Sequence, residues 1–238
     1  KEGEAFLHPL KGYVDQRGKL LLPGFVDTHI HYPQTEMIGA FGEQLLEWLT
    51  TYTFPVESQF ADADYAQEIA QFFVNQLISH GTTTALVFCT LHPASAEALF
   101  SEALRLNMRL IAGKVMMDRH VPDYLCETAG ESYEQTRELI LRWHQRGRLG
   151  YAITPRFAPT STPALLEAVQ RLRTEFPDTW LQTHLSENRE EIAWVKQLWP
   201  EHEHYLDVYH HYQLTGERSV FAHGIHLDDA EWQCLHDT

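Results

Sequence analysis

The sequence predicts an α/β protein built on a parallel β-sheet, and a TIM (β/α)8 barrel explains it better than a doubly wound sheet. Six apolar segments with the length of buried strands alternate with segments that have the 3.6-residue spacing of amphipathic helices. The strands are apolar on both faces, as is typical of a parallel sheet covered by helices. A doubly wound nucleotide-binding sheet would have a glycine-rich phosphate loop after its first strand, where this chain has "HIHYPQTEM".

The first half of the chain contains three predicted strands and three predicted helices. The helix over residues 65–81 carries Ile69, Phe72, Phe73 and Leu77 on one side, and Gly81 is typical of a helix C-terminus. In order, the predicted elements are a strand over 19–31, helices over 43–54 and 65–81, a strand over 82–90, a helix over 93–107 and a strand over 108–118.

The second half repeats the pattern. Pro163 is a favoured first residue of a helix, and Leu165, Val169, Leu172 and Phe176 follow it as one apolar stripe. In order, the predicted elements are a helix over 131–147, a strand over 151–159, the helix from Pro163, a strand over 179–187, helices over 188–199 and 205–216, and a strand over 219–227.

Composition excludes several classes of protein. With 238 residues, 44% of them hydrophobic, the chain can bury a sizeable core, and no apolar run approaches the ~20 residues of a membrane helix. The formal charge of -15 argues against binding nucleic acid or anionic membrane and favours a small-molecule partner. Cys89, Cys126 and Cys234 are too few and too scattered for a disulfide framework, so we expect a cytoplasmic protein.

Polar residues at the ends of the predicted strands form the candidate site. His29 and His31 are two positions apart on a strand and therefore share a face, while Arg156, His184 and His223 follow three later strands. Alone, each of these residues has a simpler role as an exposed or paired side chain. In a barrel, however, the C-terminal strand ends meet at one mouth, and three histidines there are a plausible set of ligands for zinc.

Glu187 is a further candidate because it follows His184 by three residues in "THLSEN". If the chain turns at Ser186, the carboxyl swings over the mouth, and Asn188 can cap the next helix with Glu191 three residues on. A carboxyl beside a metal-bound water can transfer protons. The alternative is an ordinary acidic residue in the first turn of a helix.

Several motifs resemble the amidohydrolase superfamily, which consists of metal-dependent hydrolases with a TIM barrel. These motifs are "PGFVDTHIH", "GTTTA", "HLSEN" and "AHG", and the stretches "LLEWLTTYTFPVE", "GKVMMDR", "TPRFAPT" and "HLSENREEIAWVKQLWP" are similar to the guanine deaminases in particular. The resemblance covers nearly the whole chain. It implies that His29, His31 and His184 bind one zinc ion per subunit, that His223 lies beside the metal-bound water, that Glu187 is the proton shuttle, and that Gln34, Arg156 and Phe157 hold the purine.

The resemblance implies hydrolytic deamination of guanine to xanthine and ammonia, a step of purine catabolism, in a homodimer. Three histidines also accept iron or cobalt, so the residues leave the metal open. Two alternatives remain open. The chain could belong to an amidohydrolase that acts on another ring, such as a triazine or a pterin, or it could be a non-catalytic metal-binding module.

The resemblance also implies a division of the chain. Residues 1–22 would be the trailing piece of a small β-sandwich, and residues 23–238 would be an incomplete hydrolase barrel with strands one to six. A complete barrel has eight strands, and the family pattern places a metal-binding aspartate after the eighth. We therefore expect these residues to be a fragment of a longer enzyme that, expressed alone, would expose sheet edges, aggregate and lack deaminase activity.

Overall fold

The computed structural model describes residues 15–40 and 44–238. Strands are β1 (Phe25–His31), β2 (Thr82–Phe88), β3 (Arg109–Gly113), β4 (Val115–Met116), β5 (Leu149–Pro155), β6 (Trp180–Leu185) and β7 (Ser219–His223). Helices are α1 (Leu45–Trp48), α2 (Phe54–Ser58), α3 (Ala63–Ser79), α4 (Pro93–Arg105), α5 (Ala129–Trp143), α6 (Pro163–Glu175), α7 (Arg189–Leu198), α8 (Tyr205–His211) and α9 (Asp229–Asp237). Short 3-10 turns and one π-helical turn, Leu49–Thr53, complete the described elements.

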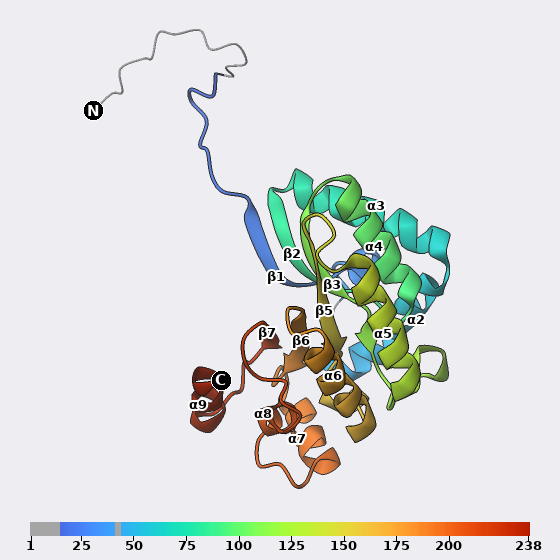
Figure 1. Ribbon diagram of the computed structural model, residues 1–238, viewed down its shortest axis with the longest axis vertical. Helices are drawn as coiled ribbons and strands as arrows, with labels where there is room; N and C mark the ends of the chain where they lie inside the picture. The colour runs from blue at the N-terminus through green and yellow to red at the C-terminus, as the bar shows by residue number, and fades with distance from the viewer. Residues whose placement is uncertain (1–14, 41–43) are drawn as a thin grey trace, which may run out of the picture.

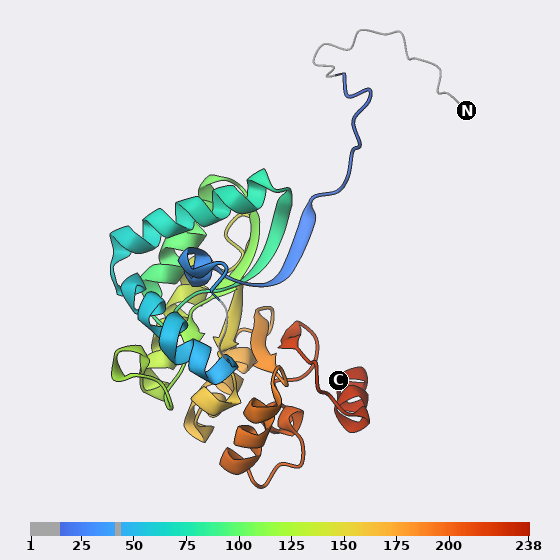
Figure 2. The ribbon, with the colours of Figure 1, turned by 180° about the vertical axis from the view of Figure 1, so that it is seen from behind.

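The strands form one curved parallel sheet in the order β1-β2-β3-β5-β6-β7, with β4 paired to β5. The sheet is a partly closed barrel of the TIM type, and α3, α4, α5 and α6 lie side by side along its outer face (Figures 1 and 2). The predicted α/β fold class is therefore confirmed. Because all strands run the same way, their C-terminal ends meet at one mouth, as the barrel prediction requires.

The third predicted strand, residues 108–118, is divided into β3 and β4 at Lys114. Gly113 lies so close to β5 that a Cβ atom there would be 1.7 Å from the carbonyl oxygen of Ala152, so only glycine fits. Lys114 is fully buried, and its Nζ pairs with Glu127 at 2.5 Å. The division comes at Lys114, whose backbone N–H donates to the Tyr151 hydroxyl at 3.2 Å and not to the backbone of a neighbouring strand.

The apolar stripes of the helices mostly pack as predicted. In α3, Ile69, Phe73 and Leu77 are buried against the sheet, whereas Phe72 is 51% exposed. The prediction for Phe72 was wrong because the buried face of α3 follows the rows 66-70-74 and 69-73-77, and residue 72 lies beside them. In α6, Leu165, Val169 and Leu172 are buried, and the C-terminal cap is at residue 176.

The predicted helix over residues 43–54 is interrupted by a π-helical turn. Its first residue, 43, lies outside the described residues. After α1, the chain widens into the π turn Leu49–Thr53 and then continues as α2, which contains Pro55. Proline has no N–H for a regular helical hydrogen bond, and π turns accommodate such breaks, often near functional sites. The turn places this segment across the mouth of the barrel.

The described N-terminal residues test only part of the predicted division of the chain at residue 22. Most of the predicted β-sandwich piece, residues 1–22, lies outside the described residues, and no strand is present from 15 to 24. The strand β1 starts at Phe25 rather than at 19, after Pro23, which cannot donate to a sheet. The division at residue 22 stays a prediction. Across the described ranges, none of the helices combines the length and apolar character needed to cross a membrane.

Candidate active site

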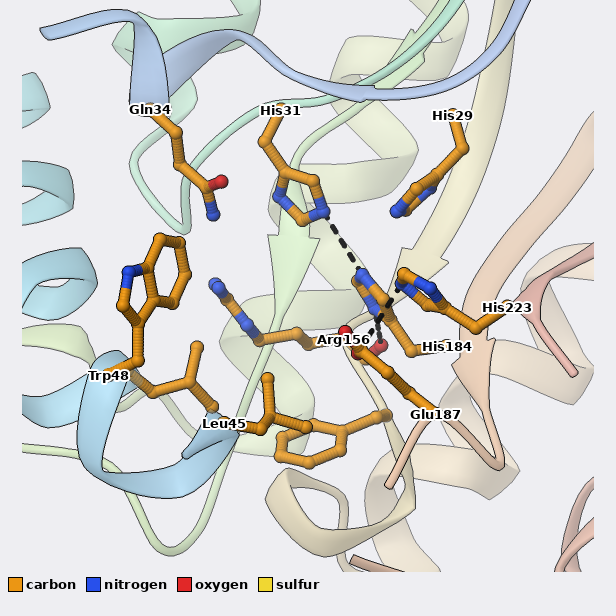
Figure 3. Close-up of a pocket in the computed structure, with 11 residues that line it drawn as sticks. His29, His31, Gln34, Leu45, Trp48, Arg156, His184, Glu187 and His223 are labelled. Carbon is orange, nitrogen blue, oxygen red and sulfur yellow. Dashed lines mark hydrogen bonds and ion pairs between the residues drawn. The ribbon is translucent and has the colours of Figure 1, made fainter. Parts of the chain in front are cut away.

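Four predicted histidines meet at the mouth of the barrel (Figure 3). The end of β1 supplies His29 and His31, β6 supplies His184, and β7 supplies His223. The ring centroid of His29 lies 5.0 Å from His31, 4.9 Å from His184 and 5.0 Å from His223. Residues separated by 153 positions thus come together, and the Nε2 atoms of His31 and His184 are 3.0 Å apart.

The donor atoms of this cluster are suited to a metal ion. Ligand nitrogens of His29, His184 and His223 all lie within 4.8 Å of one another. The ring of His31 is beside them, and its buried Nδ1 has no hydrogen-bond partner in the described part of the chain. The predicted ligand set was His29, His31 and His184; the geometry groups His223 with His29 and His184, and His31 adjoins this group through its Nε2 atom, 3.0 Å from Nε2 of His184.

The protonation of these histidines also favours metal binding. His184 Nδ1 lies 2.8 Å from the backbone oxygen of Arg156, and since a carbonyl only accepts, Nδ1 carries the proton and Nε2 has the free lone pair. Burial, and then the charge of neighbouring groups, lowers the pKa of His31 and His184 well below the ordinary value. Burial, and then the charge of His223, lowers the pKa of His29 to about 4. Neutral imidazoles are the form that binds metals.

Glu187 lies over the cluster because the chain turns after β6, as predicted. Ser186 has a φ of 50°, a left-handed conformation that reverses the strand direction. The carboxylate Oε2 of Glu187 is then 3.3 Å from Nε2 of His223. Burial raises the pKa of Glu187, while the charge of Arg156 opposes this rise. The predicted cap is confirmed: the Asn188 side chain starts α7 and forms a capping box with Glu191.

The histidines and Glu187 line a cavity of about 240 Å³. Arg156 and Phe157 line its other side, from the end of β5, and Gln34 lines it from the turn after β1. In Figure 3, the Gln34 amide and the Arg156 guanidinium point into the same space beside the Trp48 ring. The full set of lining residues is His29, His31, Gln34, Leu45, Trp48, Leu49, Arg156, Phe157, His184, Glu187 and His223. Every predicted site residue is therefore at this cavity.

A sequence profile of the amidohydrolase family matches residues 20–238. The chain belongs to the amidohydrolase family. It is 63% identical over 224 residues to the guanine deaminase of Escherichia coli, a match that covers 94% of this chain and 51% of the relative. It thus spans about half the length of the curated relatives it matches.

Solved structures of guanine deaminases have the same fold as this amidohydrolase chain. The E. coli enzyme superposes with a TM-score of 0.89 at 63% identity, covering 91% of this chain and 50% of that one. The enzyme from C. acetobutylicum, solved with guanine bound in its active site, superposes with a TM-score of 0.88 at 35% identity. That match covers 90% of this chain and 52% of that one.

Sequence reasoning missed the third wall of the amidohydrolase cavity, which consists of Leu45, Trp48 and Leu49. Their spacing fits the apolar side of a helix, and it does not distinguish a side that lines a cavity from one that packs in the hydrophobic core. The one available signal was the stretch "LLEWLTTYTFPVE", which carries part of the resemblance to guanine deaminases but whose residues had no assigned role.

A buried hydrogen-bond network supports the amidohydrolase site from behind. Glu191 is fully buried and accepts hydrogen bonds from the backbone N–H of Glu187 at 3.0 Å and from the Tyr205 hydroxyl at 2.9 Å. The Tyr209 hydroxyl donates to the backbone oxygen of His184 at 2.9 Å and accepts from the N–H of Ala158 at 2.9 Å. The network therefore holds the turn that carries Glu187 and the strand end that carries His184.

Proposed function

We propose that the complete natural protein containing this chain is a guanine deaminase, which hydrolyses guanine to xanthine and ammonia. The proposal is supported by the 63% identity to the E. coli guanine deaminase and by the likeness to a guanine deaminase structure with guanine bound. The resemblance to this family also favours a cytoplasmic homodimer. The single observation that carries the proposal is that the four histidines and Glu187 share one cavity with Gln34 and Arg156.

In this proposal, His29, His31 and His184 hold one zinc ion per subunit, with His223 beside it. The convergent nitrogens of His29, His184 and His223 fit such an ion, His31 adds its Nε2 atom 3.0 Å from Nε2 of His184, and imidazoles also accept iron. A metal ion bound here would lower the pKa of a coordinated water from about 15.7 to about 7. His184 keeps its Nε2 lone pair free for the ion because its proton is on Nδ1, which faces the backbone oxygen of Arg156.

The polar residues opposite the histidines are suited to the edge of a purine. Gln34 offers both a hydrogen-bond donor and an acceptor, which match the amide-like N1–O6 edge of guanine, while Arg156 offers only donors, which match O6 or N7. Phe157 and Trp48 provide apolar surface for a flat ring. These contacts would orient the base so that C2 and its amine face the histidines and Glu187.

Glu187 and His223 are placed to handle the protons of the reaction. Water adds to C2 of guanine, and its proton passes to the Glu187 carboxylate, which delivers it to the neighbouring ring nitrogen. A second transfer through the same carboxyl protonates the amine, which leaves as ammonia and yields xanthine. His223 lies 3.3 Å from Glu187 and can hold the oxygen that adds to C2.

The test is ammonia release by the complete natural protein from guanine, a 2-amino-substituted triazine and pterin in parallel. We expect turnover of guanine at a kcat/KM at least ~10-fold above that of the other two rings, because the triazine has no second ring to supply an acceptor like N7 for Arg156, and pterin offers the same polar edge on a larger second ring. Preference for a triazine or pterin would assign the site to another heterocycle. A metal-loaded protein that is inactive on all three would contradict a deaminase function.

A further inference from the structure

A carboxylate outside the cavity holds Arg156 from behind. Glu57, on α2, is fully buried, and Arg156 is 2% exposed. The Nη1 atom of Arg156 donates to both carboxylate oxygens of Glu57, at 3.0 Å and 2.8 Å. Glu57 is the last residue of the stretch "LLEWLTTYTFPVE", and it lies 99 positions before Arg156 in the chain. The segment that crosses the mouth therefore ends in the counter-ion of the purine-facing arginine.

The pairing occupies only one side of the guanidinium. Both hydrogen bonds come from Nη1, and Nε and Nη2 of Arg156 have no protein partner within residues 15–40 and 44–238. The Phe54 ring, also on α2, lies 5.6 Å from the Arg156 Cζ atom. We call Nε and Nη2 the free edge of Arg156, and the Arg156 side chain lines the cavity together with Gln34 (Figure 3).

The free edge has the shape that guanine requires. Nε–H and Nη2–H are two parallel donors, and O6 and N7 of guanine are two adjacent acceptors that arginine binds in this way. If Nη1 were released from Glu57, the long side chain could turn and present another edge or leave the cavity. A buried carboxylate that binds Nη1 with both oxygens prevents that rotation.

We propose that Glu57 is a positioning residue that fixes which edge of Arg156 faces the purine. The inference rests on the proposed guanine deaminase function and deepens it. Glu57 does not line the cavity and acts only through Arg156. Its removal should therefore weaken guanine recognition even where the fold and the bound metal are retained.

The experiment is a double-mutant cycle of Glu57→Gln and Arg156→Ala in the complete natural protein. We expect Glu57→Gln to lower kcat/KM for guanine by roughly 10- to 100-fold, with unchanged zinc content. The double variant should be within about twofold of Arg156→Ala alone, because Glu57 has nothing left to position. If the two losses multiply instead, Glu57 acts on the fold and the inference is wrong.

A matched control comes from the second buried ion pair, Lys114 with Glu127, which lies outside the cavity lining. Glu127→Gln also leaves a buried cation unpaired, so it should lower stability while kcat/KM stays within about twofold of wild type. An equal fall in kcat/KM in both variants would overturn the inference, as would full activity in Glu57→Gln. If Glu57→Gln does not fold, Glu57→Asp keeps the charge, shortens the side chain and enters the same cycle.

A crystal structure of the Glu57 variant separates this inference from the proposed function. If wild type does not deaminate guanine, the proposed function fails, and the position of Arg156 still decides the role of Glu57. A guanidinium that turns away from its wild-type orientation supports positioning. A guanidinium that stays in place contradicts it.

Discussion

The substitution Tyr209→Phe tests whether the buried network behind the histidines stabilises the protein. Tyr209 is fully buried, and its hydroxyl donates to the backbone oxygen of His184 at 2.9 Å. The same hydroxyl accepts from the N–H of Ala158 at 2.9 Å and from the Thr183 hydroxyl at 3.1 Å. Phenylalanine keeps the ring and opens no cavity, so the hydrogen bonds are the only interactions lost.

The expected loss follows from what becomes of each partner. The Thr183 hydroxyl can donate to the backbone oxygen of Arg156, 3.2 Å away, and stays paired. The N–H of Ala158 retains only the Tyr205 hydroxyl at 3.4 Å, and the carbonyl of His184 loses its side-chain partner. A buried polar group without a partner costs about 1–3 kcal/mol, so we expect Tyr209→Phe to lower the free energy of unfolding by about that amount.

Denaturant unfolding of the complete natural protein measures this loss. The control is Tyr133→Phe, because the Tyr133 hydroxyl bonds to Glu175 at the protein surface. We expect that control to change the free energy of unfolding by about 0.5 kcal/mol or less. A loss in Tyr209→Phe no larger than that of the control would refute the argument that the network stabilises the site.

Three further predictions concern the site and one helix of the barrel. Glu187→Gln should abolish ammonia release while the zinc content, measured on the same sample, stays unchanged. Loss of zinc together with activity would make Glu187 a metal ligand, and full activity would make it an ordinary acidic residue in the first turn of a helix. Arg156→Ala should lower kcat/KM for guanine by a factor equivalent to about 1–3 kcal/mol or more of transition-state stabilisation, with unchanged zinc content. An unaltered kcat/KM would show that Arg156 supports only the fold. Thr128→Ala removes the hydroxyl that caps α5 in a capping box with Glu131. We expect a loss of about 0.5–2 kcal/mol of stability, measured by thermal unfolding, and an unchanged melting temperature would show that the cap contributes nothing.

The sequence was most informative where strand geometry alone brings residues together. His29 and His31 are two positions apart on a strand, which places both rings on one face, and a parallel barrel then adds His184 and His223 from later strands. The turn at Ser186 was predictable because an extended chain would have pointed Glu187 away from His184. In each case, the local backbone determines the direction of the side chain.

The segment across the mouth could not be predicted in the same way. The π turn Leu49–Thr53 depends on how the chain packs around Pro55, and the apolar spacing of its residues fits an ordinary helix equally well. Glu57 was given no role from the sequence, because its partner, Arg156, is 99 positions away. Contacts of this kind are determined by tertiary packing, and the hydrophobic periodicity of the sequence does not predict them.

The most direct test of the proposed function is to incubate guanine with the zinc-loaded complete protein in water labelled with heavy oxygen. The proposal places Glu187 and the histidines around C2 of the base, where water replaces the amine. It predicts ammonia and xanthine in equal amounts, with one heavy oxygen at C2 of the xanthine. Unlabelled xanthine, or no ammonia from guanine at full metal occupancy, would contradict hydrolytic deamination at this site.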